Sequence, residues 1–487
     1  MKEEQVILVN ENDKIIGYSP KMEAHKKALL HRAFSVFIFN DKGELLMQQR
    51  ATHKYHSPDL WTNTVCSHQR AHESNLEAGK RRLLEEMGMS TELKEVFHFI
   101  YKAQLNNGLT EHELDHVLIG FSNDTPIINP DEVKAYQWKN LSEIKNDIQK
   151  NPQNYTEWFK IIFENSLSKL EKELHRFYLK QGFTFKPIFK EKLWGGKKLK
   201  NILNKNIPSD KTGESWEVST VKDNISIITN GFFKGKNFQK LINQYPEEIL
   251  GKKWATKFNK DFPLLIKYID ASDDLSIQVH PNDKMAQKHH QSFGKNELWY
   301  VVHADSKAVL YIGFKEDITQ KEYLKHLENK SIEQILNRIP VKKGDVFYIP
   351  AGTVHAIGKG VLLAEVQQTS DITYRIYDWN RVGLDGKPRE LHTEYALKAI
   401  DFKAKVLKKE MNKIKTPYFQ IEKISPSKKI FIDLKNKESF IILMILSGSY
   451  YINEKNYQKG DTVFYPAITD VLKIETKQKG EILMINL

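Results

Sequence analysis

Apolar and polar residues alternate in two different ways along the chain. In its first third, the apolar runs 34–39 and 44–48 flank the turn sequence Asn-Asp-Lys-Gly, which predicts a β-hairpin. Helical spacing of apolar residues predicts a helix over residues 74–87, ended by Gly88. The same spacing predicts that residues 154–176 are mostly helical. This part of the chain is therefore expected to form an α+β domain.

From residue 185 onward, short apolar runs alternate with Gly, Pro and Asp turns, a pattern typical of all-β sandwiches and barrels. Helical insertions are expected within residues 236–259 and 320–337. Residues 343–351 (KGDVFYIPA) resemble residues 459–467 (KGDTVFYPA). This repeat predicts two related barrels. No histidine follows the second Pro-Ala, so we expect the second barrel to hold no metal.

The chain has 487 residues, more than one core normally contains, so several domains are expected. We predict an α+β domain over residues 1–170, a linker over 171–184, a metal-binding barrel domain over 185–405 and a metal-free barrel over 406–487. The densest lysine run, residues 403–415, falls at the last of these boundaries, where we expect a second connecting segment.

Composition narrows the possible partners. The net charge is +12, but the lysines are scattered among acidic residues, which favours a solvated surface and small anionic substrates over nucleic acid. No apolar run reaches the roughly 18 residues of a membrane helix, so no membrane partner is expected. The first residues lack a signal-peptide pattern, which predicts a cytoplasmic protein. The single cysteine, Cys66, excludes an internal disulfide.

Histidine and glutamate cluster around this cysteine. The candidates are His25, His31, His68, Glu111 and Glu113. Imidazole and carboxylate together suit a divalent ion such as manganese, zinc or iron. Spacing alone leaves a metal site and a set of buried, hydrogen-bonded core residues equally open.

The segment Trp61-Thr62-Asn63-Thr64-Val65-Cys66-Ser67-His68 resembles type I isopentenyl-diphosphate isomerases, which have a Nudix fold. Further matching segments follow in the family's order: Ala24-His25, Leu30-His31-Arg32-Ala33-Phe34, Gln49-Arg50-Ala51, Glu111-His112-Glu113 and Tyr155-Thr156-Glu157-Trp158. The resemblance implies that the five histidines and glutamates hold one ion, manganese or zinc. It also implies that Glu86 helps to bind magnesium together with the substrate diphosphate.

The same resemblance implies roles in catalysis. Cys66 and Glu113 would transfer protons to and from the alkene, and Tyr101 would hydrogen-bond near them. Trp158 would stabilise a carbocation by cation–π attraction. Four basic residues would pair with diphosphate oxygens: Lys21, Arg50, Lys54 and Arg82. From the residues alone, solvated surface charges are the favoured interpretation of these four.

The Nudix box is present in altered form. Arg82 stands where a Nudix hydrolase has glutamate, and Ser67 stands where it has glycine. A hydrolase needs its helix carboxylates to hold the magnesium that activates water. The substitution therefore favours isomerisation over hydrolysis.

A second group of candidate ligands lies in the predicted barrel: Gln278, His280, Glu297 and His355. Nitrogen and oxygen donors of this kind suit zinc. From spacing alone, polar residues at strand ends without a metal are the more common case. Four segments together resemble type I phosphomannose isomerase, a zinc enzyme with a cupin (jelly-roll) fold: Gly213-Glu214-Ser215-Trp216-Glu217, Leu275-Ser276-Ile277-Gln278-Val279-His280-Pro281, Lys295-Asn296-Glu297 and Pro350-Ala351-Gly352-Thr353-Val354-His355-Ala356. The resemblance implies that these four residues bind zinc. It also implies that Lys267, Lys295, Glu365 and Arg375 line the pocket, with Arg375 stabilising developing charge.

These observations predict a bifunctional isomerase acting on isopentenyl diphosphate and mannose 6-phosphate, with an N-terminal Nudix domain and C-terminal cupin barrels. No oligomeric state is predicted. The alternative is that only one half is catalytic, while the other is a Nudix hydrolase or a sugar-phosphate-binding cupin module.

Overall fold

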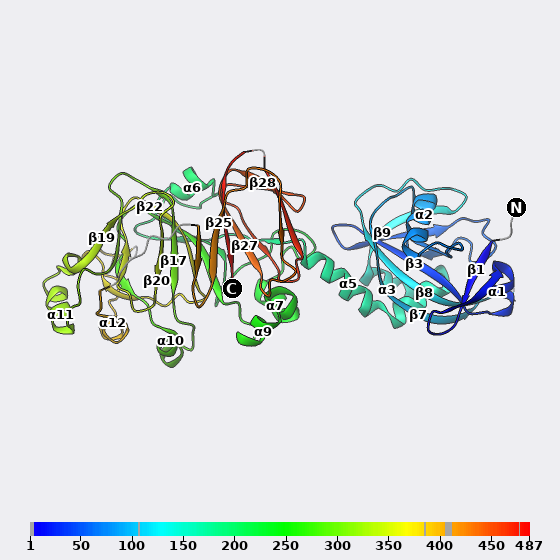
Figure 1. Ribbon diagram of the computed structural model, residues 1–487, viewed down its shortest axis with the longest axis horizontal. Helices are drawn as coiled ribbons and strands as arrows, with labels where there is room; N and C mark the ends of the chain where they lie inside the picture. Colours follow the sequence, from blue (N-terminus) through cyan, green and yellow to red (C-terminus); the bar gives the residue numbers. More distant parts are fainter. Residues whose placement is uncertain (1–3, 106–107, 384–385, 405–411, 477) are drawn as a thin grey trace. The chain divides into compact units, whose positions relative to one another are not determined.

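The computed structural model describes residues 4–105, 108–383, 386–404, 412–476 and 478–487. The chain forms two compact units, Met1–Phe177 and Tyr178–Leu487 (Figure 1). Most of the lysine run at the predicted connection, residues 405–411, lies outside the described residues. None of the described helices combines the length and the apolarity that crossing a membrane requires.

The first unit is a nine-stranded sheet with helices packed against it (Figure 1). Its elements are β1 (Gln5–Val9), β2 (Ile15–Pro20), α1 (Lys21–Lys27), β3 (His31–Phe39), β4 (Glu44–Arg50), β5 (Trp61–Thr62), β6 (Val65–Ser67), α2 (Asn75–Met87), β7 (Leu93–Gln104), β8 (Thr110–Phe121), β9 (Val133–Asn140), α3 (Leu141–Lys150), the 3-10 turn η2 (Pro152–Asn154), α4 (Glu157–Asn165) and α5 (Leu167–Leu179).

Strand β3 is central to the sheet, and almost all of its residues are buried. It runs parallel to β8, with His31 opposite Glu113, although the two strands are far apart in sequence. It also runs antiparallel to β6, which places Cys66 opposite Ser35. The hairpin predicted from residues 34–48 joins β3 to β4. These pairings bring the candidate histidine, cysteine and glutamate to one region of the sheet.

Helix α2 follows from local signals in the sequence. Ser74 and Glu77 form a reciprocal capping box at its start. Gly88 ends it with φ +63°, a left-handed conformation that glycine adopts without strain. Leu83 and Met87 pack into the core against β3. This agrees with the predicted helix over residues 74–87.

The predicted helical segment over residues 154–176 is divided. The turn η2 precedes it, and α4 and α5 are separated at Ser166. The expected linker, residues 171–184, contains the later part of α5 and a short strand, β10 (Phe183–Thr184). Leu170 and Leu174 are buried, as their helical spacing predicted.

The second unit is mostly β-structure. Its strands are β10, β11 (Ile188–Glu191), β12 (Thr212–Val218), β13 (Thr220–Val221), β14 (Asn224–Ile225), β15 (Leu264–Ala271), β16 (Ile277–Val279), β17 (Glu297–Ala304), β18 (Val309–Phe314), β19 (Leu336–Pro340), β20 (Val346–Ile349), β21 (His355–Ile357), β22 (Val361–Gln368), β23 (Tyr374–Tyr377), β24 (Lys413–Lys415), β25 (Gln420–Ile424), β26 (Ile430–Asp433), β27 (Ile441–Ser447), β28 (Ser449–Ile452), β29 (Lys455–Gln458), β30 (Thr462–Tyr465), β31 (Val471–Glu475) and β32 (Glu481–Asn486).

Its helices are short: α6 (Lys198–Leu203), α7 (Phe238–Gln244), α8 (Pro246–Leu250), α9 (Lys252–Lys257), α10 (Asp283–His290), α11 (Gln320–Glu328), η3 (Ile332–Ile335) and α12 (Thr393–Ala399). The first predicted insertion is three consecutive helices, α7 to α9. The second is a single helix, α11, followed by a 3-10 turn and the start of β19.

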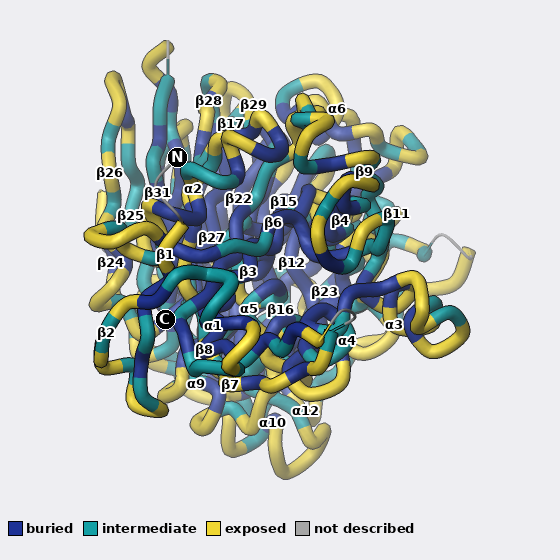
Figure 2. Tube along the Cα trace, turned by 90° about the vertical axis from the view of Figure 1, so that its right-hand side faces the viewer, coloured by how far each residue is buried: buried dark blue, intermediate teal, exposed yellow. Residues whose placement is uncertain are grey.

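Two sheets face each other in the first barrel of this unit. Their strand orders are β11-β12-β15-β22-β17-β20 and β19-β18-β21-β16-β23. Trp299 on β17 and Leu310 on β18 belong to one apolar core, so the two sheets share it. Figure 2 shows that the sheet strands are largely buried, while exposed positions gather in the connecting segments.

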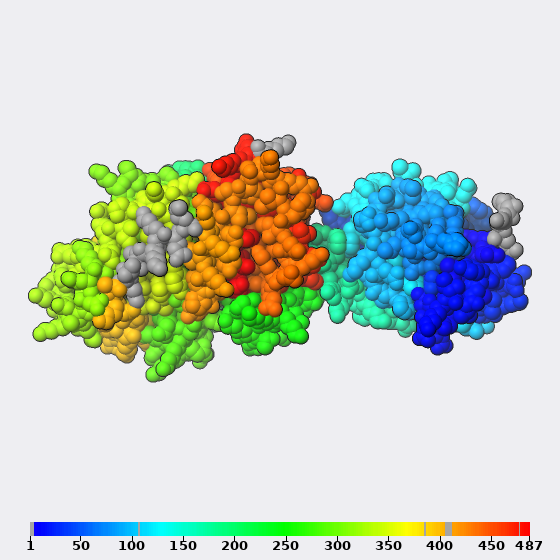
Figure 3. Space-filling view, viewed as in Figure 1, coloured from blue at the N-terminus to red at the C-terminus, as the bar shows by residue number. Residues whose placement is uncertain are grey.

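Residues from 412 onward, together with β10, form two further sheets around their own core. Their strand orders are β10-β30-β27-β32-β25-β24 and β26-β31-β28-β29. The repeated Gly-Asp turn has the same conformation in both copies, with φ +91° at Gly344 and +93° at Gly460. Helices α7 to α9 lie against this last part of the chain (Figure 3). For example, Ala467 donates a backbone hydrogen bond to Ile249.

Candidate functional site

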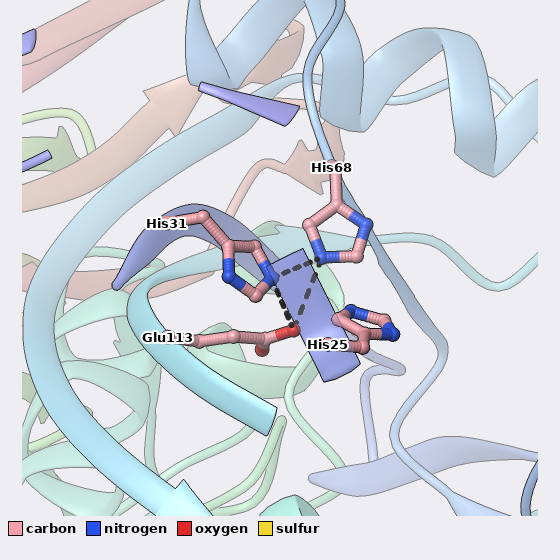
Figure 4. Close-up of side chains that lie close together, drawn as sticks. All are labelled: His25, His31, His68 and Glu113. Atoms are coloured by element: carbon pink, nitrogen blue, oxygen red, sulfur yellow. Dashed lines mark hydrogen bonds and ion pairs between the residues drawn. The ribbon is translucent and has the colours of Figure 1, made fainter. Parts of the chain in front are cut away.

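The first candidate site is a buried group of four side chains from four separate segments of the chain (Figure 4). His25 comes from α1, His31 begins β3, His68 follows β6, and Glu113 lies on β8. Each offers one ligand atom, and these atoms all lie within 4.8 Å of one another. His68 Nε2 is 3.0 Å from Glu113 Oε1 and 3.2 Å from His31 Nε2.

The donor set fits a divalent metal. Neither ring nitrogen of His25 has a hydrogen-bond partner in the described structure, and neither does His68 Nδ1, although all are buried. Leaving buried polar atoms without partners is costly. Burial lowers the pKa of His25 to about 3 and that of His68 to about 4, so both rings are neutral. A neutral imidazole is the form that binds a metal.

Glu111, the fifth predicted ligand, stands beside this group rather than in it. The Tyr101 hydroxyl donates to Glu113 Oε2 at 2.6 Å and lies 3.1 Å from Glu111 Oε2. Burial raises the pKa of Glu111 well above its usual range, with the Glu113 charge adding to the effect. The tyrosine thus connects the two glutamates that the sequence singled out.

A pocket opens next to the group. Its lining includes most of the residues predicted to act here: Lys21, Arg50, Lys54, Cys66, His68, Arg82, Glu86, Tyr101, Glu111, Glu113 and Trp158. Loss of hydration raises the pKa of the Cys66 thiol to about 12, so it keeps its proton at neutral pH. Arg50 lies close to both the thiol and the Trp158 indole. Its Nη1 is 4.0 Å from Cys66 Sγ, and its guanidinium carbon is 5.4 Å from the Trp158 ring centroid.

Three of the basic residues of the pocket, Lys21, Lys54 and Arg82, are paired with carboxylates. Arg82 Nη2 is 2.6 Å from Glu86 Oε1 and 3.1 Å from Glu132 Oε2. Lys54 also pairs with Glu132. Lys21 Nζ is 3.3 Å from Glu4 Oε2. The arginine that replaces a Nudix glutamate therefore neutralises the carboxylate next to it on α2.

Sequence reasoning missed two lining residues. Glu132 pairs with both Lys54 and Arg82, but it precedes β9 in a segment without a recognisable motif. His56 lies edge-on to Trp158, with ring centroids 6.0 Å apart. Burial lowers the pKa of His56 to about 3. Its only signal in the sequence was its position two residues after Lys54.

The second candidate site lies in the first barrel of the second unit. Gln278 on β16 is the register partner of His355 on β21, and Nε2 of Gln278 is 3.3 Å from Nε2 of His355. Glu297, at the start of β17, completes the group. Its Oε1 is 3.2 Å from His280 Nε2, and its Oε2 is 3.6 Å from His355 Nε2. The structure therefore brings the four predicted zinc ligands together.

Both histidines are oriented by backbone carbonyls. Nδ1 of His280 is 3.0 Å from the carbonyl of Ile372, and Nδ1 of His355 is 2.8 Å from that of Thr353. A hydrogen bond from Nδ1 leaves Nε2 with its lone pair, which is the usual arrangement of a metal-binding histidine. Burial lowers the pKa of both rings. The donor set fits a divalent metal.

Charged residues surround this group. Lys295 Nζ is 3.0 Å from Glu297 Oε1 and 3.1 Å from His280 Nε2. Lys267 and Glu365 are register partners on β15 and β22, with Nζ and Oε1 2.8 Å apart. Arg375 on β23 is the register partner of Gln278 and donates to the carbonyl of Glu390 at 2.8 Å. Three of the four predicted pocket residues thus lie on strands, and Lys295 lies two residues before β17 and beside the ligand group.

The environment also includes Glu214 and Trp299, which were not predicted as site residues. Glu214 Oε2 is 4.0 Å from Lys267 Nζ and accepts from Trp216 Nε1 at 2.6 Å. Trp299 Nε1 donates to Glu365 Oε2 at 2.8 Å. Glu214 belongs to the Gly-Glu-Ser-Trp-Glu segment, so its motif carried a signal.

Comparisons with known proteins agree with this division. The model of the NUDIX domain matches residues 29–159, and that of the phosphomannose isomerase type I catalytic domain matches residues 183–296. Isopentenyl-diphosphate Delta-isomerase of Pectobacterium atrosepticum is 50% identical over 33% of this chain and 89% of its own. Mannose-6-phosphate isomerase ManA of Bacillus subtilis is 34% identical over 60% of this chain and 95% of its own.

A solved structure agrees as well. Mannose 6-phosphate isomerase from Bacillus subtilis is similar over 63% of this chain and 99% of its own, with 30% identity and a TM-score of 0.56. The fold and the relatives define two classes of metal-binding isomerase in one chain, one with a Nudix fold and one with a cupin fold, as predicted. The chain belongs to the isopentenyl-diphosphate isomerase family through its N-terminal part and to the type I mannose-6-phosphate isomerase family through its C-terminal part.

Proposed function

We propose that the chain is a bifunctional isomerase. The N-terminal unit would interconvert isopentenyl and dimethylallyl diphosphate, and the C-terminal unit would interconvert mannose 6-phosphate and fructose 6-phosphate. The names of the relatives support each activity. The observation that carries the proposal is that each family's motif residues converge on a buried histidine–glutamate group.

In the N-terminal unit, moving the double bond requires adding a proton to the terminal alkene carbon and removing one from the carbon next to the other end of the double bond. An acid and a base on opposite faces of the flat alkene would do this. Cys66 and Glu113 would make these two transfers. Glu113 is held by His68 and by the Tyr101 hydroxyl, so its position is fixed. Trp158 would face the tertiary carbocation and stabilise it by cation–π attraction.

A metal ion and basic side chains would complete this site. A manganese or zinc ion on His25, His31, His68 and Glu113, with Glu111 beside them, would supply fixed positive charge that orients the glutamates. Glu86 would help to hold magnesium next to the diphosphate. Lys21, Lys54 and Arg82 would exchange their present carboxylate partners for diphosphate oxygens, while Arg50 would approach from the Trp158 side.

The N-terminal activity is tested with isopentenyl diphosphate and magnesium in heavy water, with the products followed by NMR. We expect dimethylallyl diphosphate that carries deuterium, and no such product from Cys66→Ala. Release of phosphate without movement of the double bond would instead establish the alternative of a Nudix hydrolase. No reaction from folded, metal-loaded protein would leave the C-terminal half as the only enzyme.

In the C-terminal unit, a proton moves between the first two carbons of the sugar, and negative charge develops on oxygen. Zinc on Gln278, His280, Glu297 and His355 would polarise these oxygens. Lys295 would add positive charge beside Glu297, from which it is 3.0 Å away. Arg375 would stabilise the developing enediolate, and the Lys267–Glu365 pair would form the wall of the pocket.

This activity is tested by assaying fructose 6-phosphate formation and zinc content together. We expect His355→Ala to lose one equivalent of zinc and all turnover of mannose 6-phosphate. As a matched control, His303→Ala removes a histidine that is half-exposed and paired with Asp305, and it should change neither. Binding of mannose 6-phosphate by the wild-type chain without turnover would favour the alternative of a sugar-phosphate-binding module.

A further inference from the structure

A third group of potential ligands lies in the first unit, outside the site described above. Glu95 and His98 lie on β7, and His116 lies on β8. One ligand atom from each lies within 4.8 Å of the other two. His116 is buried, Glu95 is half-buried, and His98 is exposed, so the group is open to solvent on one side. Side chains alternate along a strand, so His116 faces away from Glu113, three residues earlier on β8.

An irregularity in β7 creates the group. In a regular strand, residues three apart, such as Glu95 and His98, point to opposite faces. The register between β7 and β8 shifts between Glu95 and Phe97, as in a β-bulge, which resets the alternation. Consequently His98 stands directly opposite His116, while Glu95 Oε1 is 2.7 Å from His116 Nδ1.

The spacing of the rings matches that in the two family sites. The ring centroids of His98 and His116 are 5.3 Å apart. In the first site the corresponding separations are between 5.0 and 5.8 Å, and in the second site His280 and His355 are 4.8 Å apart. The third pair of imidazoles is therefore as well placed to share an ion as the others.

Surrounding groups hold the candidate ligands in position. Glu95 Oε2 accepts from Asn75 Nδ2 at 3.1 Å, which leaves Oε1 directed at His116. On the other side of the ring, His116 Nε2 makes no hydrogen bond, but it lies 3.4 Å from Asp13 Oδ2. Asp13 is itself fixed by Arg32 Nε at 2.7 Å. A carboxylate behind a histidine orients the ring of a metal ligand and raises its basicity.

We propose that Glu95, His98 and His116 form a third metal site, separate from both catalytic groups, which takes a divalent ion such as zinc. Two imidazoles and one carboxylate are the donor set that such ions prefer, with water filling the open position. Asp13 acts behind His116 as a positioning residue. Because the ligands come from β7 and β8, the ion ties this strand pair together.

The test counts zinc on the full chain after chelator treatment and reloading, by native mass spectrometry. The variant His98→Ala should bind one equivalent fewer than the wild-type chain, and the exposed position of this residue makes the change compatible with folding. The control His303→Ala, whose histidine also lies beside a carboxylate, should keep the full number. Zinc should also raise the unfolding temperature of the first unit more in the wild-type chain than in His98→Ala.

A second variant tests the positioning role. Asp13→Asn keeps the left-handed backbone at this position, φ +59°, which asparagine tolerates. It should weaken the affinity of this one zinc by about 10- to 100-fold. Equal zinc content in the wild-type and His98→Ala chains, whatever the total, would overturn the proposal. If His98→Ala loses one zinc but Asp13→Asn binds it with unchanged affinity, the positioning role of Asp13 is overturned.

Discussion

Replacing Lys267 by methionine should strongly destabilise the second unit. The Lys267 ammonium lies 2.8 Å from Glu365 Oε1 and 4.0 Å from Glu214 Oε2. The side chains of Lys267 and Glu365 are only 8% and 3% exposed. Methionine fills a similar volume, so the change mainly removes the positive charge and leaves a carboxylate buried beside Trp299.

Breaking a buried ion pair by removing one partner costs about 3–5 kcal/mol. We expect the lower end of this range, about 3 kcal/mol, because Glu214 keeps Lys192, whose Nζ is 3.2 Å from its Oε1. Glu365 also keeps the hydrogen bond from Trp299. A loss of about 3 kcal/mol raises the unfolded fraction of the unit roughly a hundredfold.

The sign of the pH dependence follows from the same contacts. Burial raises the pKa of Glu365, the nearby Glu297 charge adds to this, and Lys267 opposes both. Without Lys267 the folded pKa rises further above the unfolded value. The stabilising contribution of the neutral carboxyl is complete below the unfolded pKa and is lost as the pH rises. The deficit of the variant should therefore be larger at about pH 8 than at about pH 5.

Pulse proteolysis in urea measures this, because the surviving fragment of each unit is resolved by size. A double variant, Lys267→Met with Glu365→Gln, should recover part of the lost stability, since it removes the unpaired charge as well. If the single variant unfolds at the wild-type urea concentration, or if the double variant is as unstable as the sum of the two single changes, this reasoning is refuted.

Three further outcomes are expected. Cys66→Ser should lower the isomerisation rate of isopentenyl diphosphate by about 10²- to 10⁴-fold, measured by NMR, without lowering the unfolding temperature. Tyr101→Phe should slow the same reaction about 10-fold, because it removes a hydrogen bond of about 1–3 kcal/mol to Glu113; an unchanged kcat would contradict this. Hydrogen bonds from Lys139, Tyr155 and Asn151 lower the pKa of Asp147. Asp147→Asn should therefore cost about 1 kcal/mol of stability at neutral pH. This loss should shrink as the pH falls below the unfolded pKa of about 3.9 and vanish below the lower folded pKa. An equal loss of stability at low pH would disprove this.

Local elements of the fold could be predicted because their signals are contained in neighbouring residues. The apolar runs around the turn at residues 40–43 gave the β3–β4 hairpin, and the Ser74 cap and Gly88 gave α2. The break at Ser166 could not be foreseen, since apolar residues at helical spacing occur on both sides of it. Likewise, the short strand β10 has too few residues to show a period.

The candidate sites were predictable to the extent that a family motif marked them. Their convergence depends on long-range pairing, such as that of β3 with β8, which leaves no local pattern. Glu132 and His56 reach the first pocket from segments without a motif, so only the structure brings them in. The bulge in β7 is a further case, because strict alternation would have separated Glu95 from His98. The catalytic and binding roles assigned from the motifs stay predictions.

Strand β10 has a consequence for how the second unit is made. Phe183 in β10 is the register partner of Phe464 in β30, and Phe238, Phe262 and Phe440 also pack against Phe464. During synthesis, β10 is the first strand of the unit to leave the ribosome, and it has no strand partner until β30, one of the last strands, has been made. Until then its aromatic surface is exposed, and exposed apolar surface on an incomplete chain favours aggregation. Premature termination after β23 would therefore release a chain that carries all four candidate metal ligands of the second unit but is prone to aggregate.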